Sequence, residues 1–276
     1  MSEKGKIKEI TKNMTEKEER EISREKRRVQ EAEEKYISWE PKTKLGKDVK
    51  LGKIKDIDFV LDNNLKILEE QIVDKLANIK SDLFSIGQSK GKFGGGKRRA
   101  WRQTQRKTKE GNVPTFSAFA VVGDENGHIG IGYGRAKETL PARDKAIRKA
   151  KLNIIKIKRS CASFDCACSE PHTVPFKVEG KSGSVKVVLI PAPQGTGLVA
   201  ANELKKILKF AGIKDVYSKT FGSRRTTFNL IKACFEALKR TSPKHRSVYT
   251  LIPSRAYPNG HKREGTSPKA LNEGVK

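Results

Sequence analysis

The clearest structural pattern in the chain lies in TFSAFAVVGDENGHIGIGYG, residues 115–134. Residues 115–122 are apolar and rich in side chains that favour β-strands, and residues 123–127 (GDENG) tolerate the positive φ angles of a tight turn. In residues 128–134 (HIGIGYG) glycines alternate with larger side chains, so one face of a strand would be bare and another backbone could approach it closely. The stretch therefore predicts a β-hairpin.

A helix is expected directly after this hairpin. Thr139 can serve as its cap, with Pro141 in the first turn, where proline is tolerated. Small and aliphatic residues then recur at helical spacing on one face, and basic residues occupy the opposite face. The apolar set is Ala142, Ala146, Ala150 and Ile154, and the basic set is Arg143, Lys145, Arg148, Lys149 and Lys151. We expect the first face to pack and the second to remain free for phosphate.

The second half of the chain predicts another region of mixed structure. Strands are expected over residues 174–178 and 184–190, joined by a glycine-containing turn at 180–183. The segment that follows is expected to lead into a helix over residues 198–211, which ends at Gly212.

A short strand over residues 215–219 and a last helix complete this pattern. The helix has an apolar face formed by Phe228, Ile231, Phe235 and Leu238. Strands and helices in this order indicate an α+β fold class. We divide the chain into a charged N-terminal extension (1–38), a first domain (39–160) with a basic loop (88–110), a linker with a cysteine cluster (161–172), a C-terminal α+β domain (173–240) and a basic tail (241–276).

The net charge of the chain indicates which class of molecule it binds. The chain carries 59 Lys and Arg against 32 Asp and Glu, a formal charge of +27, and only 35% of its residues are hydrophobic. A surplus of this size is compensated by a polyanion with release of counterions, so nucleic acid is the first partner to consider and an anionic membrane surface the second. No stretch approaches the ~18 apolar residues of a membrane span, and no signal-peptide pattern is visible. We expect a cytoplasmic protein that binds no membrane and is not a homo-oligomer.

The strongest RNA-binding signal lies between Asp82 and Glu110, where no acidic residue occurs and basic residues surround glycines 94–96. The alternative is a solvated charge run, which explains many single clusters. Here the glycine-rich hinge and a tryptophan among arginines favour irregular or single-stranded RNA, whose bases stack on aromatic and guanidinium planes. The expected RNA contacts in this stretch are Lys97, Arg98, Arg99, Trp101, Arg102, Arg106 and Lys107.

Two further pairs of cations are candidates for phosphate contacts. Arg135 and Lys137 follow the alternating glycines of residues 128–134 and precede the positive end of the expected helix. The alternative is that these glycines only fit the hairpin against its own domain. Arg224 and Arg225 lie just before the last helix, although exposed turn residues would give the same pattern.

No catalytic constellation is recognisable. The glycine-rich segments 132–135 and 193–198 lack the residues of a phosphate loop and do not open a dinucleotide-binding unit. The histidines have no neighbouring Ser or Asp pattern that suggests a catalytic triad. We therefore expect a protein that is not an enzyme.

The cysteines suggest a metal site. Cys161, Cys166, Cys168 and His172 bring three thiols and an imidazole together in a short segment, and a structural zinc ion takes four such ligands. Such a site would leave no position open for catalysis. The spacing counts against zinc, because paired zinc ligands are usually separated by two residues, whereas Cys166 and Cys168 are separated by one. Small buried thiols and a disulfide are the alternatives.

Several segments together resemble the ribosomal protein S-five family of the small subunit, over about residues 39–240. They are residues 121–138 (VVGDENGHIGIGYGRAKE), 150–155 (AKLNII), 171–175 (PHTVP), 189–197 (LIPAPQGTG) and 211–215 (AGIKD). Residues 39–46 (WEPKTKLG) and 171–176 (PHTVPF) resemble its archaeal and eukaryotic branch. Residues 1–35, the basic stretch 90–109 and the tail after Thr241 depart from the common family pattern.

The resemblance implies an N-terminal domain like a double-stranded-RNA-binding domain, followed by a C-terminal domain of the family's own fold. It also implies that the region 130–137 faces rRNA of the small ribosomal subunit, near the channel through which mRNA enters. The implied neighbours are the S-four and S-eight proteins, and the implied roles are in decoding accuracy and in unwinding mRNA. A free RNA-binding or RNA-chaperone protein is the alternative. A metal-dependent RNA-processing enzyme is disfavoured, because no carboxylate near the cysteines could act as a base.

Overall fold

The computed structural model describes residues 39–88, 98–161, 166, 168 and 170–242. They fold into two compact units that divide between Asn78 and Ile79. The sequence pattern places residues 39–78 in the first domain, whereas in the structure they belong to a separate unit. Over the described ranges, no helix is both long enough and apolar enough to cross a bilayer.

The first unit contains α2 (Lys44–Lys50), α3 (Ile57–Asp62) and α4 (Glu70–Leu76). Glu69, at the start of α4, is linked to the segment that precedes α2, because its Oε1 accepts hydrogen bonds from the backbone N–H groups of Lys42 and Thr43 at 3.0 and 2.7 Å. Its Oε2 accepts a hydrogen bond from Nε1 of the buried Trp39 at 2.8 Å. Burial opposes ionisation of this carboxyl, but the hydrogen bonds outweigh it and lower the pKa of Glu69.

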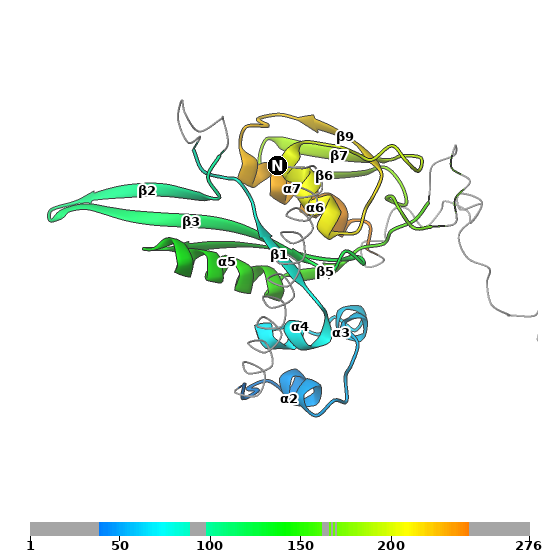
Figure 1. Ribbon diagram of the computed structural model, residues 1–276, viewed down its shortest axis with the longest axis horizontal. Helices are drawn as coiled ribbons and strands as arrows, with labels where there is room; N and C mark the ends of the chain where they lie inside the picture. The colour runs from blue at the N-terminus through cyan, green and yellow to red at the C-terminus, as the bar shows by residue number, and fades with distance from the viewer. Residues whose placement is uncertain (1–38, 89–97, 162–165, 167, 169, 243–276) are drawn as a thin grey trace, which may run out of the picture. The chain divides into compact units, whose positions relative to one another are not determined.

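The second unit begins with an antiparallel sheet (Figure 1). Its strands are β1 (Lys80–Leu83), β2 (Trp101–Thr108), β3 (Gly111–Gly123), β4 (His128–Ala136) and β5 (Ile154–Lys156). The order is β1-β3-β4-β5, and β2 pairs with the first part of β3. Helix α5 (Thr139–Leu152) packs on one face of this sheet. This arrangement agrees with the double-stranded-RNA-binding-like domain that the family resemblance implies.

The predicted hairpin over residues 115–134 is present as β3 and β4. Asp124 closes its turn, because Oδ1 accepts hydrogen bonds from the backbone N–H groups of Asn126 and His128 at 2.8 and 3.0 Å. Gly127 has a φ of 109°, which glycine adopts without the steric cost that other residues carry. The GDENG segment therefore forms the tight turn that its composition predicts.

Helix α5 fills the bare face of β4. The glycines are Gly130, Gly132 and Gly134, and the helix residues that face them are Ala150, Ala146 and Ala142. A Cβ atom on any of these glycines would lie 2.2 Å from the carbonyl oxygen of the facing alanine. Only glycine fits there, so these residues seat the hairpin against its own helix, which is the second of the two interpretations that the sequence allows.

A second sheet follows, with the order β6-β7-β9-β8. Its strands are β6 (Val178–Ser182), β7 (Val185–Pro191), β8 (Leu198–Val199) and β9 (Val216–Phe221). The pairs β6-β7 and β7-β9 are antiparallel, and β8 pairs with β9 in parallel. Helices α6 (Asn202–Phe210) and α7 (Thr227–Lys239) lie on one side of this sheet (Figure 1). The strands and helices confirm the α+β class.

The first strand of this sheet differs from the prediction. It begins at Val178 rather than at residue 174, and Gly180 lies inside it rather than in the turn. Helix α7 passes so close that a Cβ on Gly180 would lie 2.0 Å from the carbonyl oxygen of Ala233. The turn itself lies at Gly183, which has a φ of 59°. Gly180 is therefore a packing residue, which its position in the sequence does not reveal.

Two other segments also differ. The helix expected from residue 198 begins at Asn202, because residues 198–199 form strand β8 instead. The basic loop expected over residues 88–110 is in part a strand, since residues 101–108 pair with β3 along their whole length as β2. Pairing with another strand decides both cases, since β2 forms a tight hairpin with β3 and β8 pairs with β9 farther along the chain.

One hydrophobic cluster runs through both sheets of the second unit. Phe119 and Ile129 contribute to it from the first sheet, Val187 and Leu189 from the second, and Leu238 from α7. Each of these side chains is at most 1% exposed. The two expected domains on either side of the linker therefore share a continuous core.

Candidate RNA-binding surface and cysteine–histidine cluster

The basic stretch of the sequence forms a two-stranded ribbon. Strand β2 pairs with β3 in unbroken register, from Trp101 opposite Ala118 to Thr108 opposite Gly111. The paired ends of these strands project away from α6 and α7 (Figure 1), and every β2 side chain except that of Thr104 is exposed. The basic side chains are therefore displayed on a regular projecting element rather than on an irregular loop.

The pleat of β2 divides the predicted contacts between two faces. Successive side chains of a strand point to opposite sides, so Arg102 and Arg106 share one face, whereas Trp101 and Lys107 share the other. Arg135 of β4 joins Arg102, because both residues pair with the same residue of β3. The structure thus brings Arg102, Arg106 and Arg135 to one surface and separates them from Trp101.

The remaining members of the basic stretch precede β2. Arg98 and Arg99 are exposed, and Lys97 lies outside the described residues. The Trp101 side chain is 40% exposed, so part of its ring is accessible.

Arg135 and Lys137 are exposed at the end of β4 and just after it. The glycine-bared face of this strand is not open to phosphate, because α5 occupies it, and that part of the expectation is corrected. Thr139 is the first residue of α5, and Glu138 holds the cap position without a capping hydrogen bond from its side chain. A phosphate contact of Arg135 and Lys137 would rest on their own charges and stays a prediction.

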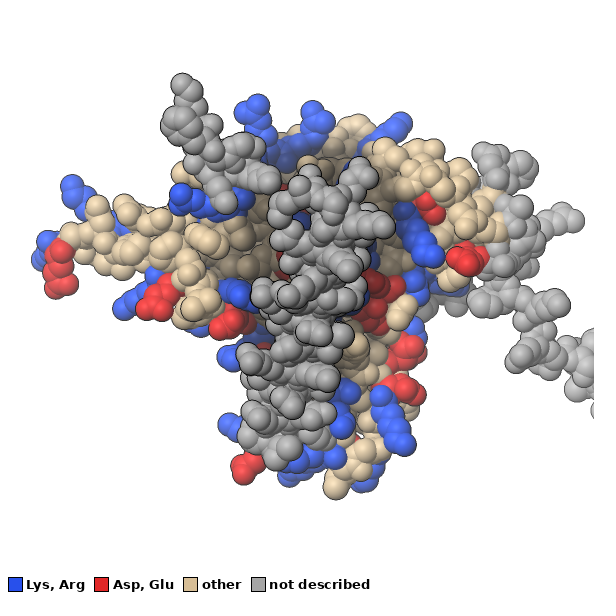
Figure 2. All heavy atoms as spheres, in the orientation of Figure 1, with Lys and Arg blue, Asp and Glu red and all other residues tan. Residues whose placement is uncertain are grey.

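Arg224 and Arg225 lie in the turn between β9 and α7, and both side chains are exposed. On the face shown in Figure 2, lysine and arginine side chains project from the ribbon and along the edge of the second sheet. The same view shows acidic side chains mainly away from that edge. The exposure of both arginines is compatible with either interpretation of this pair.

The connection between β5 and β6 is closed into a loop. The backbone groups of Ser160 and Thr173 exchange two hydrogen bonds of 2.9 Å, as an isolated antiparallel bridge. Cys161 and His172 are the neighbours of this bridge within the loop, so backbone pairing brings the first and last candidate ligands close together.

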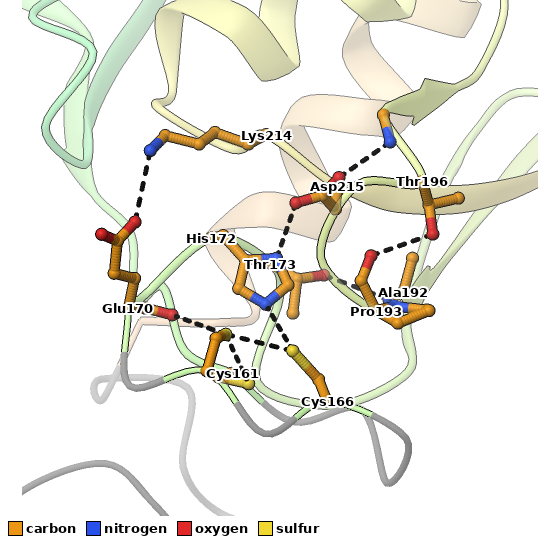
Figure 3. A network of polar contacts seen from close by, with 12 residues as sticks. Cys161, Cys166, Glu170, His172, Thr173, Ala192, Pro193, Thr196, Lys214 and Asp215 are labelled. Carbon is orange, nitrogen blue, oxygen red and sulfur yellow. Dashed lines mark hydrogen bonds and ion pairs between the residues drawn. The ribbon is translucent and has the colours of Figure 1, made fainter.

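The four candidate ligands converge inside this loop (Figure 3). Cys166 Sγ lies 3.1 Å from Cys168 Sγ and 3.5 Å from His172 Nε2. Cys168 Sγ lies 3.3 Å from Cys161 Sγ, and all four ligand atoms lie within 4.8 Å of one another. The cysteines are free thiols. The one-residue spacing between Cys166 and Cys168 therefore does not keep their sulfur atoms apart.

Asp215 orients the imidazole of His172 (Figure 3). His172 Nδ1 lies 2.8 Å from Asp215 Oδ2, and the two side chains are only 1% and 5% exposed. Asp215 Oδ1 accepts a hydrogen bond from the backbone N–H of Gly197 at 2.7 Å. With Nδ1 directed at a carboxylate, Nε2 remains to face the sulfur atoms, which is how metal-binding histidines are commonly held.

Asp215 is not among the site residues that the sequence predicts. Nothing in the segment 211–215 marks its aspartate as a partner of a histidine so far away in the chain. The fold brings them together because the backbone N–H groups of Lys214 and Asp215 donate hydrogen bonds to the carbonyl oxygen of His172, at 2.9 and 3.2 Å. The one available signal is an acidic residue next to an apolar strand.

The thiols differ in acidity. The hydrogen bond between the Cys166 and Cys168 sulfur atoms is the largest factor that lowers the pKa of Cys166 to about 6. Burial is the largest factor that raises the pKa of Cys161 to about 12. Cys234 lies apart in α7, where complete burial raises its pKa to about 12. A metal ion bound here would displace the remaining thiol protons, since thiols bind metals as thiolates.

Two family models match the second unit of the chain. The model described as "Ribosomal protein S5, N-terminal domain" matches residues 100–158, and "Ribosomal protein S5, C-terminal domain" matches residues 180–247. The first match covers the ribbon, the hairpin and α5, and the second begins within β6. The cysteine cluster lies between the two matched ranges.

Archaeal proteins named "Small ribosomal subunit protein uS5" are similar over most of the chain. The protein of Nanoarchaeum equitans is 50% identical over 205 residues, which are 74% of this chain and 88% of the relative. The protein of Methanocaldococcus jannaschii is 45% identical over 223 residues, 79% of this chain and 96% of the relative. The protein of Thermofilum pendens is 46% identical over 204 residues, 74% of this chain and 94% of the relative.

Proposed function

Since this chain belongs to the ribosomal protein S5 family, we propose that it binds rRNA through the exposed face of the β2–β3 ribbon. The family consists of structural proteins of the small ribosomal subunit in the cytoplasm, and the chain is such a constituent rather than an enzyme. Arg102, Arg106 and Arg135 on one surface carry the proposal, because phosphate contacts from Lys and Arg dominate affinity for RNA.

The proposed position is near the channel through which mRNA enters the small subunit, beside the S-four and S-eight proteins. The motivation is the family resemblance together with the net charge of +27, which a protein embedded in rRNA would neutralise. In this position the chain would contribute to decoding accuracy. If it is instead a free RNA chaperone, sucrose-gradient sedimentation of a cell extract will leave it outside the small-subunit fraction.

The salt dependence of binding tests the role of the ribbon. Removing one phosphate contact should reduce the slope of log affinity against log salt by about one unit, so Arg102→Ala with Arg106→Ala should reduce it by about two. The measurement is filter binding of small-subunit rRNA to the full chain between low and high salt. Gln103→Ala with Gln105→Ala is the matched control on the opposite face of the same strand. An unchanged slope in the arginine variant would contradict the proposal.

We also propose that Cys161, Cys166, Cys168 and His172 hold a structural zinc ion. Three thiols and an imidazole are the donor set that zinc prefers, and they leave no open position. At zinc–sulfur distances of about 2.3 Å, tetrahedral ligands lie roughly 3.8 Å apart, so the sulfur atoms would separate by about half an ångström on binding. The ion would fix the loop between β5 and β6, where Asp215 already holds His172.

Metal analysis of purified small subunits tests the zinc proposal. We expect one zinc ion per chain in excess of the zinc bound by subunits that lack this chain. The excess should disappear with Cys166→Ser and persist with Cys234→Ala, which removes a buried thiol outside the cluster. X-ray absorption should show sulfur ligands about 2.3 Å from the metal. A disulfide among the three cysteines, or metal content independent of Cys166, would contradict the site.

A further inference from the structure

A solvent-open hollow of about 490 Å³ lies between the first sheet and α7. It is lined by Arg102, Thr104, Ser117, Phe119, Tyr133, Arg135, Phe228 and Lys232. The first six belong to neighbouring strands of the sheet, and the last two lie on one side of α7. The hollow therefore exists only because the two domains share a core, and its volume is that of a small-molecule site.

The floor of the hollow is a fixed aromatic corner. Phe119 is buried, and its ring centroid lies 5.8 Å from that of Phe228 with the planes inclined at 71°. Tyr133 is 38% exposed and meets Phe228 edge to face, with centroids 5.6 Å apart. The Tyr133 hydroxyl donates a hydrogen bond to Ser117 Oγ at 3.1 Å, which restrains the ring. An accessible tyrosine face is thus held in place before any ligand arrives.

The rim of the hollow is cationic. Arg102 and Arg135 flank Ser117 from the strands on either side of β3, and Lys232 projects from α7 opposite them. Among the described residues that line the hollow, none carries a carboxylate. A ligand that fits must therefore combine a flat apolar surface with negative charge.

We infer that this hollow binds one unpaired nucleotide of rRNA, with its base against Tyr133 and Phe228 and its phosphate near Arg102 and Arg135. A base within a duplex cannot offer its face to an aromatic ring, whereas an unstacked base can. Acidic side chains have no aromatic surface, so no single unmodified peptide side chain offers both features. The inference rests on the proposed rRNA binding and names a subsite within it.

Ultraviolet crosslinking of intact small subunits, followed by mass spectrometry of the peptides, tests the occupant directly. We expect a mononucleotide adduct on Tyr133 or Phe228. If adducts form on the ribbon but not in the hollow, this inference fails while rRNA binding stands. If no residue of the chain crosslinks to rRNA, both fail. A Lys232 crosslink to another ribosomal protein, without a nucleotide adduct in the hollow, would assign it to a protein partner and overturn the inference.

Chemical probing of rRNA in subunits assembled with variants provides the second test. Tyr133→Leu should make one nucleotide reactive and weaken rRNA binding about 5- to 150-fold, the range for loss of a stacked base. Tyr133→Phe keeps the ring and should leave that nucleotide protected, which separates stacking from the hydroxyl contact. Tyr217→Leu is the matched control, because Tyr217 is a similarly exposed tyrosine, 41%, on β9. Equal reactivity of every nucleotide in the Tyr133→Leu and Tyr217→Leu subunits would overturn the inference.

Discussion

Helix α5 buries alanines against the first sheet, whereas α7 buries large aliphatic and aromatic side chains against the second. Glycines face α5 at three successive inward positions of β4, and a single glycine of β6, Gly180, faces α7. Helix α5 approaches β4 closely because the strand residues that face it have no side chains. Helix α7 is held against the second sheet by the burial of large side chains such as Leu238 and Ile231, which are fully buried.

Because the two helices are held in different ways, we expect different kinds of substitution to destabilise the α5 and α7 interfaces. Burial of apolar area stabilises α7, at about 25 cal/mol per Å², so removing atoms there should cost the most. The α5 interface has little side-chain area to lose, but its backbones lie so close that any added atom must displace the helix. The outward side of α5 remains basic, so this thin packing also leaves a cationic surface for a partner.

The largest effect is expected for Gly132→Val. A Cβ at residue 132 would lie 2.2 Å from the Ala146 carbonyl oxygen and 2.3 Å from the Ala150 backbone nitrogen, so the helix must move. We expect a loss of about 4 kcal/mol in the free energy of unfolding, at the upper end for single substitutions. Urea unfolding of the full chain measures it. Gln103→Val adds a valine at an exposed strand position and should change stability by less than about 0.5 kcal/mol.

Leu238→Ala should cost about 3 kcal/mol, because it removes a fully buried side chain and leaves a cavity. The same change on α5, Leu140→Ala, affects a side chain that is 66% exposed and should cost less than about 0.5 kcal/mol. The two urea unfolding midpoints give the difference. Similar losses in both variants would mean that α5 also depends on side-chain burial.

Gly180→Ala tests the same distinction at the α7 interface, because it adds one carbon atom where stability comes from the burial of large side chains. The new Cβ would lie 2.0 Å from the Ala233 carbonyl oxygen, and we expect a loss of about 2 kcal/mol. This is smaller than the loss for Gly132→Val, since a single crossing point can relax around a methyl group. A loss greater than that of Gly132→Val, measured in the same urea titration, would refute the proposed distinction.

The smallest effect on stability is expected for Lys145→Ala combined with Lys149→Ala, on the exposed side of α5. Exposed charges contribute little to folding, so the unfolding free energy should change by less than about 0.5 kcal/mol. If this side faces rRNA, the salt slope of binding should fall by about one unit for each lysine that touches a phosphate. A large loss of stability would show that α5 relies on these charges rather than on close backbone packing.

The sequence predicted the local elements well where the pattern was strong. The hairpin of residues 115–134 and helix α5 follow from alternation, turn residues and helical spacing, all of which act over short distances. Residues 101–108 were harder, because their many charges indicate a loop, and only pairing with β3 makes them a strand. Gly180 was assigned to a turn because a glycine in a turn and a glycine beneath a helix look alike in sequence.

The available chemistry follows directly from the residues: the excess of cations, the three thiols with an imidazole, and the bare face of β4. Tertiary structure decided how these groups are used. It gave the bare face to α5 rather than to phosphate, divided the cations of β2 between two faces, and brought Asp215 to His172. The reason is physical: residue types and spacing fix local geometry and charge, but contacts between distant segments depend on the whole chain packing into one core.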